Sequence, residues 1–403
     1  MTKSLVMAPS QHPLNRRSWL KLAGVAAGGY ALSGGMLPLF AQTAAAKKLI
    51  TRQEKPFNAE PALDVLTREW ITPWESFFVR SHGDVPQVNL DAYRLKIEGL
   101  VEHPREYRAE ELGMRNSAFP TVSTMATLTC AGNRRAEFAA THQQKVPGVG
   151  WDGGAIGNAE WSGVRLSDLL KAAGVKPEAK HVWFEGLDGI EHQGASHPFG
   201  GSIPLAQAMA DSTTSPGAII CSRMNGQPLT AEHGAPLRAV VPGFIGARSV
   251  KWISRIIVSD QPSTNRFLAR EYKLLREGTD AEIAATPPVY EMALNSVITT
   301  GKKDGDRLTL RGFALPQGQL GRVIERVELT ADAGKTWTPA EIVSPAQSFC
   351  WTLWTAEVPA GANASKVAVR AVDNRGETQP MTVPWNIKGY QYNAWHNWSV
   401  PQA

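Results

Sequence analysis

The chain has 403 residues, of which 43% are hydrophobic and 20% charged, and its formal net charge is +5. That length is too great for one compact core, so two domains are expected. Three cysteines are too few for a disulfide framework, and without a basic stripe or a nucleic-acid module we expect no nucleic-acid partner.

The N-terminal segment has the features of an export signal. A twin-arginine run, Asn15–Lys21, precedes a weakly apolar, Gly/Ala-rich stretch from Leu22 to Phe40, and small residues follow at Ala44–Ala46. This order is typical of a twin-arginine signal peptide, which we assign to residues 1–46. A transmembrane anchor is the alternative, but the stretch is barely long enough to span and contains several glycines. We therefore expect a cleaved signal and no stable membrane anchor.

A signal of this kind predicts a periplasmic protein that folds before export, often around a bulky cofactor. The signal contains four basic residues and no acid, so its removal takes the formal net charge from +5 to +1. The chain has no Cys-x-x-Cys-His run, so we expect no covalently attached haem.

The first domain is expected over residues 47–284 and has a mixed α+β pattern. Tyr93–Ile97 alternates like a strand, and Leu166–Ala173 has helical apolar spacing with Gly174 at its end. His181–Phe184 and Arg238–Val241 are short apolar or β-branched runs that predict strands. Strict strand–helix alternation is missing, which argues against a doubly wound sheet.

The pattern changes near Thr286, and a second domain is expected over residues 285–403. Four alternating segments follow at regular spacing, separated by turns: Arg307–Phe313, Arg322–Thr330, Ser348–Glu357 and Lys366–Val372. Short strands at such spacing predict an immunoglobulin-like β-sandwich.

Cys130 is the most informative residue, because it lies in a run of unusual composition, Thr127–Arg135 (Thr-Leu-Thr-Cys-Ala-Gly-Asn-Arg-Arg). Nearby cations favour the thiolate, which is the form that binds metals or acts as a nucleophile. An inert buried cysteine at the end of an apolar strand is the alternative. Cys221 and Cys350 lie in apolar, strand-like surroundings and are expected to be inert.

Other motifs accompany Cys130 in a fixed order. They are Ser76–His82, Phe184–Asp188, Met224–Leu229, His233–Gly243, Gly246–Trp252, Arg370–Asp373 and Asn393–His396. Each motif is weak alone, but the ordered set resembles the sulfite oxidase family of molybdopterin enzymes, and most closely its haem-free periplasmic bacterial sulfite dehydrogenases. The resemblance runs from about Phe77 to Trp398 and implies a molybdopterin-binding catalytic domain followed by a β-sandwich dimerisation domain.

The resemblance implies a molybdenum–molybdopterin cofactor with Cys130 as the one protein ligand to the metal. It assigns further cofactor contacts to Phe78, Arg80, His82, Asp188, His233, Arg238, Ser249, Val250 and Lys251. Arg and Lys suit the phosphate of such a cofactor.

The resemblance also implies an oxyanion pocket with three catalytic residues besides Cys130. Arg80 and Arg370 would bind the anion, Arg370 being supplied by the second domain, and Tyr272 would hydrogen-bond the substrate. A core tyrosine is the alternative for Tyr272. Two positions depart from the family pattern: Ser81 replaces the usual Asn, and Ala235 replaces a large aromatic residue.

These expectations combine into a periplasmic homodimer that oxidises sulfite to sulfate and passes electrons to a separate c-type cytochrome. A (methionine) sulfoxide reductase or a sulfane dehydrogenase subunit of the same fold is the alternative enzyme. A non-catalytic periplasmic binding protein is a third interpretation, and the twin-arginine signal argues against it.

Overall fold

The computed structural model describes residues 49–113, 117–211, 217–359 and 366–399, all of which belong to one compact unit, Ala45–Ala403. The predicted signal, residues 1–46, lies outside the described residues. Within the described ranges no helix is long and apolar enough to cross a membrane. The first described element is a hairpin of β1 (Leu49–Gln53) and β2 (Asn58–Pro61).

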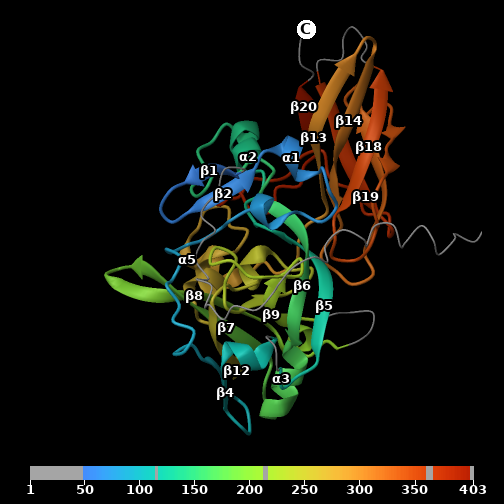
Figure 1. Cartoon of the computed structure of the whole chain (residues 1–403). Coiled ribbons are helices and arrows are strands. Elements are labelled where there is room, and N and C mark those ends of the chain that lie inside the picture. Colours follow the sequence, from blue (N-terminus) through green and yellow to red (C-terminus); the bar gives the residue numbers. More distant parts are fainter. Residues whose placement is uncertain (1–48, 114–116, 212–216, 360–365, 400–403) are drawn as a thin grey trace, which may run out of the picture. The chain divides into compact units, whose positions relative to one another are not determined.

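The Cys130 segment belongs to an antiparallel sheet in which β5 and β6 form the longest pairing (Figure 1). Its strands are β5 (Thr121–Thr129), β6 (Ile156–Arg165), β9 (Ile219–Met224) and β10 (Gln227–Pro228), and β11 (Arg238–Val240) also pairs with β9. Apolar side chains such as Trp161 and Leu128 are almost fully buried beneath it. Their burial holds the end of β5, and therefore Cys130, inside the molecule.

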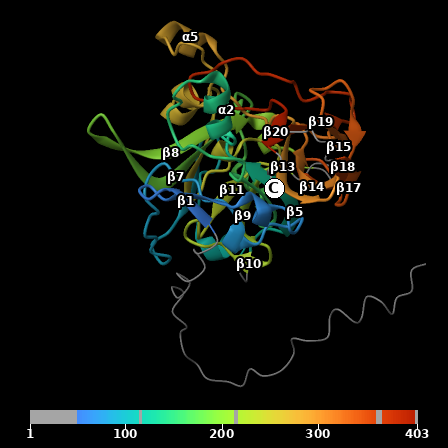
Figure 2. The same cartoon turned by 90° about the horizontal axis from the view of Figure 1, so that it is seen from above.

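A second sheet has the order β4-β3-β12-β7-β8 and pairs β12 with β3 in parallel. Its strands are β3 (Leu95–Gly99), β4 (Arg105–Tyr107), β7 (His181–His192), β8 (Ala195–Pro204) and β12 (Ile253–Ser259). The β7–β8 hairpin projects from the body of the unit (Figure 2). β3 begins two residues later than the sequence predicts, because Tyr93 instead buries its ring and donates its hydroxyl to the carbonyl of Ile253.

Helices are short in the described ranges, where no α-helix exceeds eight residues. They are α1 (Leu63–Leu66), α2 (Arg135–His142), α3 (Leu166–Ala173), α4 (Leu205–Ala208) and α5 (Asp280–Ala285). α3 has the predicted bounds, and Gly174 ends it with φ +69°, a conformation that favours glycine. The described fold is therefore richer in strands than the α+β prediction suggests. Four further segments form single helical turns: Trp74–Ser76, Ala109–Leu112, Gly246–Arg248 and Phe267–Glu271.

The later part of the chain forms two four-stranded antiparallel sheets that share one core (upper right in Figure 1). One contains β13 (Asn295–Asp304), β14 (Arg307–Leu315), β17 (Glu341–Ile342) and β18 (Thr352–Pro359). The other contains β15 (Ile324–Thr330), β16 (Thr338–Pro339), β19 (Lys366–Asp373) and β20 (His396–Ser399).

Cys350 lies in the loop before β18, so its predicted strand position is wrong. It is buried, as is Cys221 in β9, and burial raises the pKa of the two thiols to about 11 and about 12.

Arg134 joins the Cys130 segment to these later sheets. Its side chain is fully buried, and it donates to Asn295 Oδ1 at 2.7 Å and to the Ala394 carbonyl at 2.8 Å. It also pairs with Glu137 at 2.8 Å. A cation that the sequence suggests as a tuner of the thiol therefore forms a structural clamp.

Candidate active site

Cys130 is the first residue after β5, and backbone hydrogen bonds fix its position. Its N–H donates to Ala155 O at 2.9 Å, and its carbonyl accepts from Asn133 N at 2.9 Å. The side-chain amide of Asn133 binds the segment before β6, because its Nδ2 donates to Gly153 O and its Oδ1 accepts from Ala155 N. Only 8% of Cys130 is exposed, and that part faces a hollow of about 670 Å³ including its mouth.

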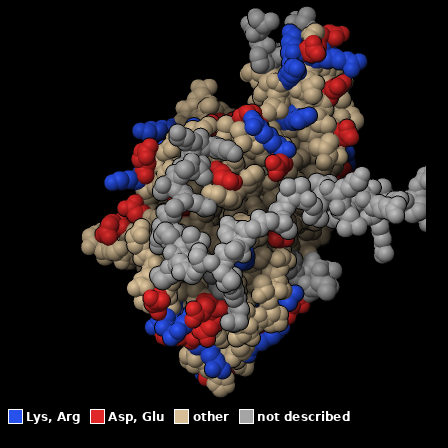
Figure 3. Space-filling view, viewed as in Figure 1, with Lys and Arg blue, Asp and Glu red and all other residues tan. Residues whose placement is uncertain are grey.

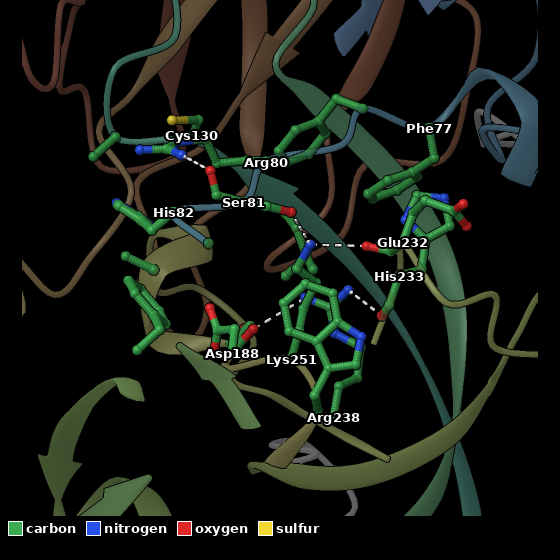
Figure 4. A pocket seen from close by; sticks show the side chains of 18 of the residues that line it. Phe77, Arg80, Ser81, His82, Cys130, Asp188, Glu232, His233, Arg238 and Lys251 are labelled. Atoms are coloured by element: carbon green, nitrogen blue, oxygen red, sulfur yellow. Dashed lines mark hydrogen bonds between the residues drawn. The ribbon is translucent and has the colours of Figure 1, made fainter. Parts of the chain in front are cut away.

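The hollow collects segments that are far apart in the sequence (Figure 4). Ten of the twelve predicted site residues line it: Phe78, Arg80, His82, Cys130, Asp188, His233, Arg238, Ser249, Lys251 and Tyr272. The side chain of Val250 instead packs in the core, and its carbonyl accepts from Ala239 N.

Two basic side chains lie together in the hollow without a salt bridge to any described residue. Lys251 Nζ donates to Ser81 Oγ and to the Glu232 carbonyl, both at 2.8 Å. Arg238 donates to the carbonyls of His233 and Ser249, both at 3.0 Å. Burial lowers the pKa of Arg238 to about 10, and burial and Arg238 together lower the pKa of Lys251. Arg238 is buried and Lys251 is half-buried, and uncompensated cations in such surroundings are unfavourable, so this arrangement suits a bound anion such as phosphate.

Asp188 is a buried carboxyl group with an acceptor to spare. It is 4% exposed, and its Oδ1 has no hydrogen-bond partner among the described residues. Burial raises its pKa to about 6, although Lys251 acts in the opposite direction. A ligand with N–H donors would satisfy this oxygen, as a pterin ring can.

His82 and Tyr272 form a neutral hydrogen-bonded pair on another wall. The Tyr272 hydroxyl lies 3.1 Å from His82 Nε2, and the imidazole stacks on Phe199 at 4.6 Å. Burial, followed by the nearby Arg80, lowers the pKa of His82 well below its usual range. Burial raises the pKa of Tyr272 to about 12, so at neutral pH its hydroxyl keeps its proton and can donate it.

Two residues that were not among the predicted site residues, Arg135 and Tyr390, also lie at this wall. Arg135 is buried and donates to the carbonyls of Val149 and Lys388, while its guanidinium lies 5.2 Å from the Tyr390 ring centre. Tyr390 stacks on Tyr272 with ring centres 5.1 Å apart. Burial raises the pKa of both tyrosines, and the positive charges of Arg80 and Arg135 act in the opposite direction. Arg135 belongs to the quoted Cys130 run, whereas Tyr390 has no local motif.

The structure does not place Arg370 among the residues that line the hollow. Arg370 lies on β19, where its Nε donates to Glu328 Oε2 at 2.7 Å. Its guanidinium covers the Trp337 ring at 3.7 Å from the ring centre. These aromatic and acidic contacts account for an arginine at this position without a role in the hollow.

These features define a class of protein: around one hollow lie a thiol, two cations with no salt bridge and a carboxyl oxygen with no partner among the described residues, and this set fits a molybdopterin. Residues 82–267 match the family described as "Oxidoreductase molybdopterin binding domain", and residues 286–403 match "Mo-co oxidoreductase dimerisation domain".

Comparison with individual relatives identifies the family within this class. Sulfite oxidase of Gallus gallus is 37% identical over 86% of this chain and 77% of its own length. Mitochondrial sulfite oxidase of Drosophila melanogaster is 38% identical over 86% of this chain and 62% of its own length. The crystal structure of the sulfane dehydrogenase SoxCD from Paracoccus pantotrophus has a TM-score of 0.71 and 28% identity, covering 94% of this chain and 96% of that one. The chain belongs to the sulfite oxidase family of molybdopterin oxidoreductases. It spans 62–65% of the length of three mitochondrial sulfite oxidases, those of Drosophila melanogaster, Macaca fascicularis and Homo sapiens.

Proposed function

We propose that this protein is a periplasmic, molybdenum-dependent sulfite dehydrogenase that passes electrons to an external acceptor such as a c-type cytochrome. The observation that carries the proposal is the hollow in which Cys130 lies with Arg80, Tyr272 and two further cations. The names of the sulfite oxidase relatives support the substrate. The twin-arginine run supports the compartment.

The residues of the hollow fit the cofactor group by group. Arg238 and Lys251 would hold its phosphate, and Asp188 would accept from the N–H groups of its pterin. Cys130 would be the thiolate ligand of molybdenum, a metal for which a soft sulfur donor is suitable. When bound, the cofactor supplies oxygen-atom transfer and a two-electron change of redox state, and the chain positions and tunes it.

The chain's own contribution to the reaction is binding of an anion in fixed orientation. Sulfite and one water become sulfate, two protons and two electrons. Arg80, with Arg135 close by, supplies positive charge for the substrate and for the dianionic product, and the protonated Tyr272 supplies a hydrogen-bond donor. Preorganised charge in a site with little water is usually a large part of catalysis.

A sulfane dehydrogenase is the second candidate, favoured by the near-complete structural coverage of SoxCD. We also propose a homodimer, which the description of the matched residues 286–403 supports. The two sheets with a common core support an immunoglobulin-like topology for that domain.

The purified protein should contain molybdenum and should reduce both ferricyanide and cytochrome c when sulfite is added. Reduction with a sulfane-sulfur donor but not with sulfite would favour the second candidate. Failure with both donors, together with oxidation of a reduced dye by methionine sulfoxide, would identify a reductase. Protein that is folded but free of molybdenum and pterin after expression in a molybdenum-replete host would contradict all three enzymes.

A further inference from the structure

Asn58, in β2, is a wholly buried amide that contacts the predicted anion site from outside both matched family segments. Its Oδ1 accepts from Ser81 N at 2.9 Å and from Arg80 Nη1 at 3.2 Å. A backbone bridge between Ala59 and Val79, with hydrogen bonds of 3.0 and 2.8 Å, joins the same two segments. The first hairpin therefore holds the Arg80 segment through both backbone and side chain.

The orientation of the Asn58 amide is determined by its surroundings. Its Nδ2 faces two acceptors, Gln53 Oε1 at 3.2 Å and Pro56 O at 2.9 Å. A flipped amide would place an oxygen against these acceptors and an NH₂ group against the donors of Arg80 and Ser81. All four hydrogen bonds are therefore made in one orientation only.

The contact extends from Arg80 to the cation pair. Ser81, whose N–H is held by Asn58, accepts at its Oγ from Lys251 Nζ at 2.8 Å. Figure 4 shows Arg80, Ser81 and Lys251 around the same hollow. One amide thus orients the guanidinium and supports the serine that accepts from the lysine.

We propose that Asn58 is a positioning residue that orients Arg80 for an oxyanion while leaving its positive charge uncompensated. The inference rests on the proposed function, in which Arg80 binds the substrate anion. An amide oxygen suits this role because it accepts hydrogen bonds without carrying charge. A carboxylate at this position would hold the guanidinium equally well but would neutralise it. A serine hydroxyl is neutral and can accept two hydrogen bonds, but its oxygen lies one atom closer to the backbone and would reach the two donors less well.

The decisive variant is Asn58→Asp, which keeps the shape of the side chain and adds a negative charge beside Arg80. In molybdenum-loaded enzyme we expect the KM for sulfite to rise at least about tenfold, the loss expected for one charge-assisted hydrogen bond. The kcat should change far less than the KM, and molybdenum content should equal that of wild type. Sulfate binding, followed as the shift of unfolding temperature with sulfate concentration, should weaken in parallel. Thr51→Ala, an exposed change in the same hairpin, is the matched control and should behave as wild type.

Asn58→Ser keeps the experiment decisive if the aspartate variant does not fold, because serine is small and neutral. We expect a smaller rise in the KM for sulfite and a correspondingly smaller loss of sulfate affinity. A KM and a sulfate affinity equal to those of wild type in a folded Asn58 variant would overturn the inference. An equal fall in kcat and molybdenum content, with the KM unchanged, would also overturn it, since that indicates only a structural role.

Failure of the proposed function gives a different pattern. Wild-type enzyme that binds sulfate but does not oxidise sulfite contradicts the dehydrogenase proposal. The positioning role would still be supported if Asn58→Asp then lost sulfate affinity. Wild-type enzyme that neither binds sulfate nor oxidises sulfite would contradict both.

Discussion

At the scale of single residues, Cys130 is the side chain whose replacement separates binding from chemistry. Cys130→Ser should fold and retain the pterin, because Arg238, Lys251 and Asp188 lie on other segments of the hollow. Turnover should be lost, since a serine oxygen is a poorer ligand than thiolate for a soft metal. Pterin and molybdenum analysis beside a steady-state assay tests this, and wild-type turnover in the loaded variant would contradict the ligand assignment.

Arg80 and Arg370 are two arginines that the structure separates into different environments. Arg80→Gln should raise the KM for sulfite by a factor corresponding to about 1.5–3 kcal/mol, the range for a hydrogen bond to a charged group. Arg370→Gln is the matched control, because Arg370 pairs with Glu328 and Trp337 away from the hollow. Its KM should equal that of wild type. An equal rise in the KM for sulfite in both variants would indicate that Arg370 also binds the substrate.

His396, in β20, should make stability sensitive to acid. Its Nδ1 accepts from Ile298 N at 3.2 Å, and burial lowers its pKa to about 4 from the usual 6.5. Glu137 opposes this shift and Arg134 adds to it. The folded protein therefore holds neutral imidazole, and the stability that this residue contributes is lost as pH falls from about 6.5 to about 4.

The difference in unfolding free energy between wild type and His396→Gln isolates this residue from other titrating groups. We expect the difference to change by about 3 kcal/mol in disfavour of wild type between neutral pH and pH 4, as the pKa shift implies. Denaturant unfolding at several pH values measures it. A difference that does not change with pH would show that His396 titrates normally.

At the scale of elements, the start of α2 is tied to the later sheets through Arg134. Arg134→Met should destabilise the protein by about 3 kcal/mol or more, because it leaves Glu137 without its arginine partner. It also removes the charged donor of Asn295 Oδ1 and the Ala394 carbonyl, which then keep only Gln379 Nε2. Arg307→Met is the control, since the Arg307–Glu357 pair is 73% and 63% exposed and should contribute less than about 1 kcal/mol. Equal unfolding free energies for the two variants would contradict the clamp.

At the scale of the whole molecule, charge should influence electron exit only locally. The formal net charge without residues 1–46 is +1, and acidic and basic side chains are interspersed on the face shown in Figure 3. Long-range steering of a cytochrome should then be weak, and docking should depend on charges near the hollow. Turnover with cytochrome c should fall as salt rises to physiological strength.

Ferricyanide provides the control for this salt dependence, because it accepts electrons without protein docking. A salt effect on sulfite binding would appear with both acceptors, whereas an effect on docking would appear only with the cytochrome. Equal salt dependence with the two acceptors would therefore contradict a local docking patch.

The sequence by itself determined the features that depend on neighbours along the chain. α3 and its terminating Gly174 follow from apolar spacing and from the freedom of glycine, and the β-strand pattern beyond residue 285 follows from alternation. The motifs around Cys130 also identified the family, because the order of motifs along the chain can be recognised without the structure. Alternation does not predict β13 or β20; β13 is ten residues long, but its residues (Asn-Ser-Val-Ile-Thr-Thr-Gly-Lys-Lys-Asp) do not alternate between apolar and polar.

Only the tertiary structure decided which of these residues meet. Arg370 and Arg80 are both arginines in family-like runs, but a strand face covered by Trp337 removes the first from the hollow. Tyr390 reaches Tyr272, and Asn58 reaches Arg80, across sequence separations that no local pattern encodes. Side-chain partners depend on how sheets and loops pack, and burial then determines which charges remain uncompensated.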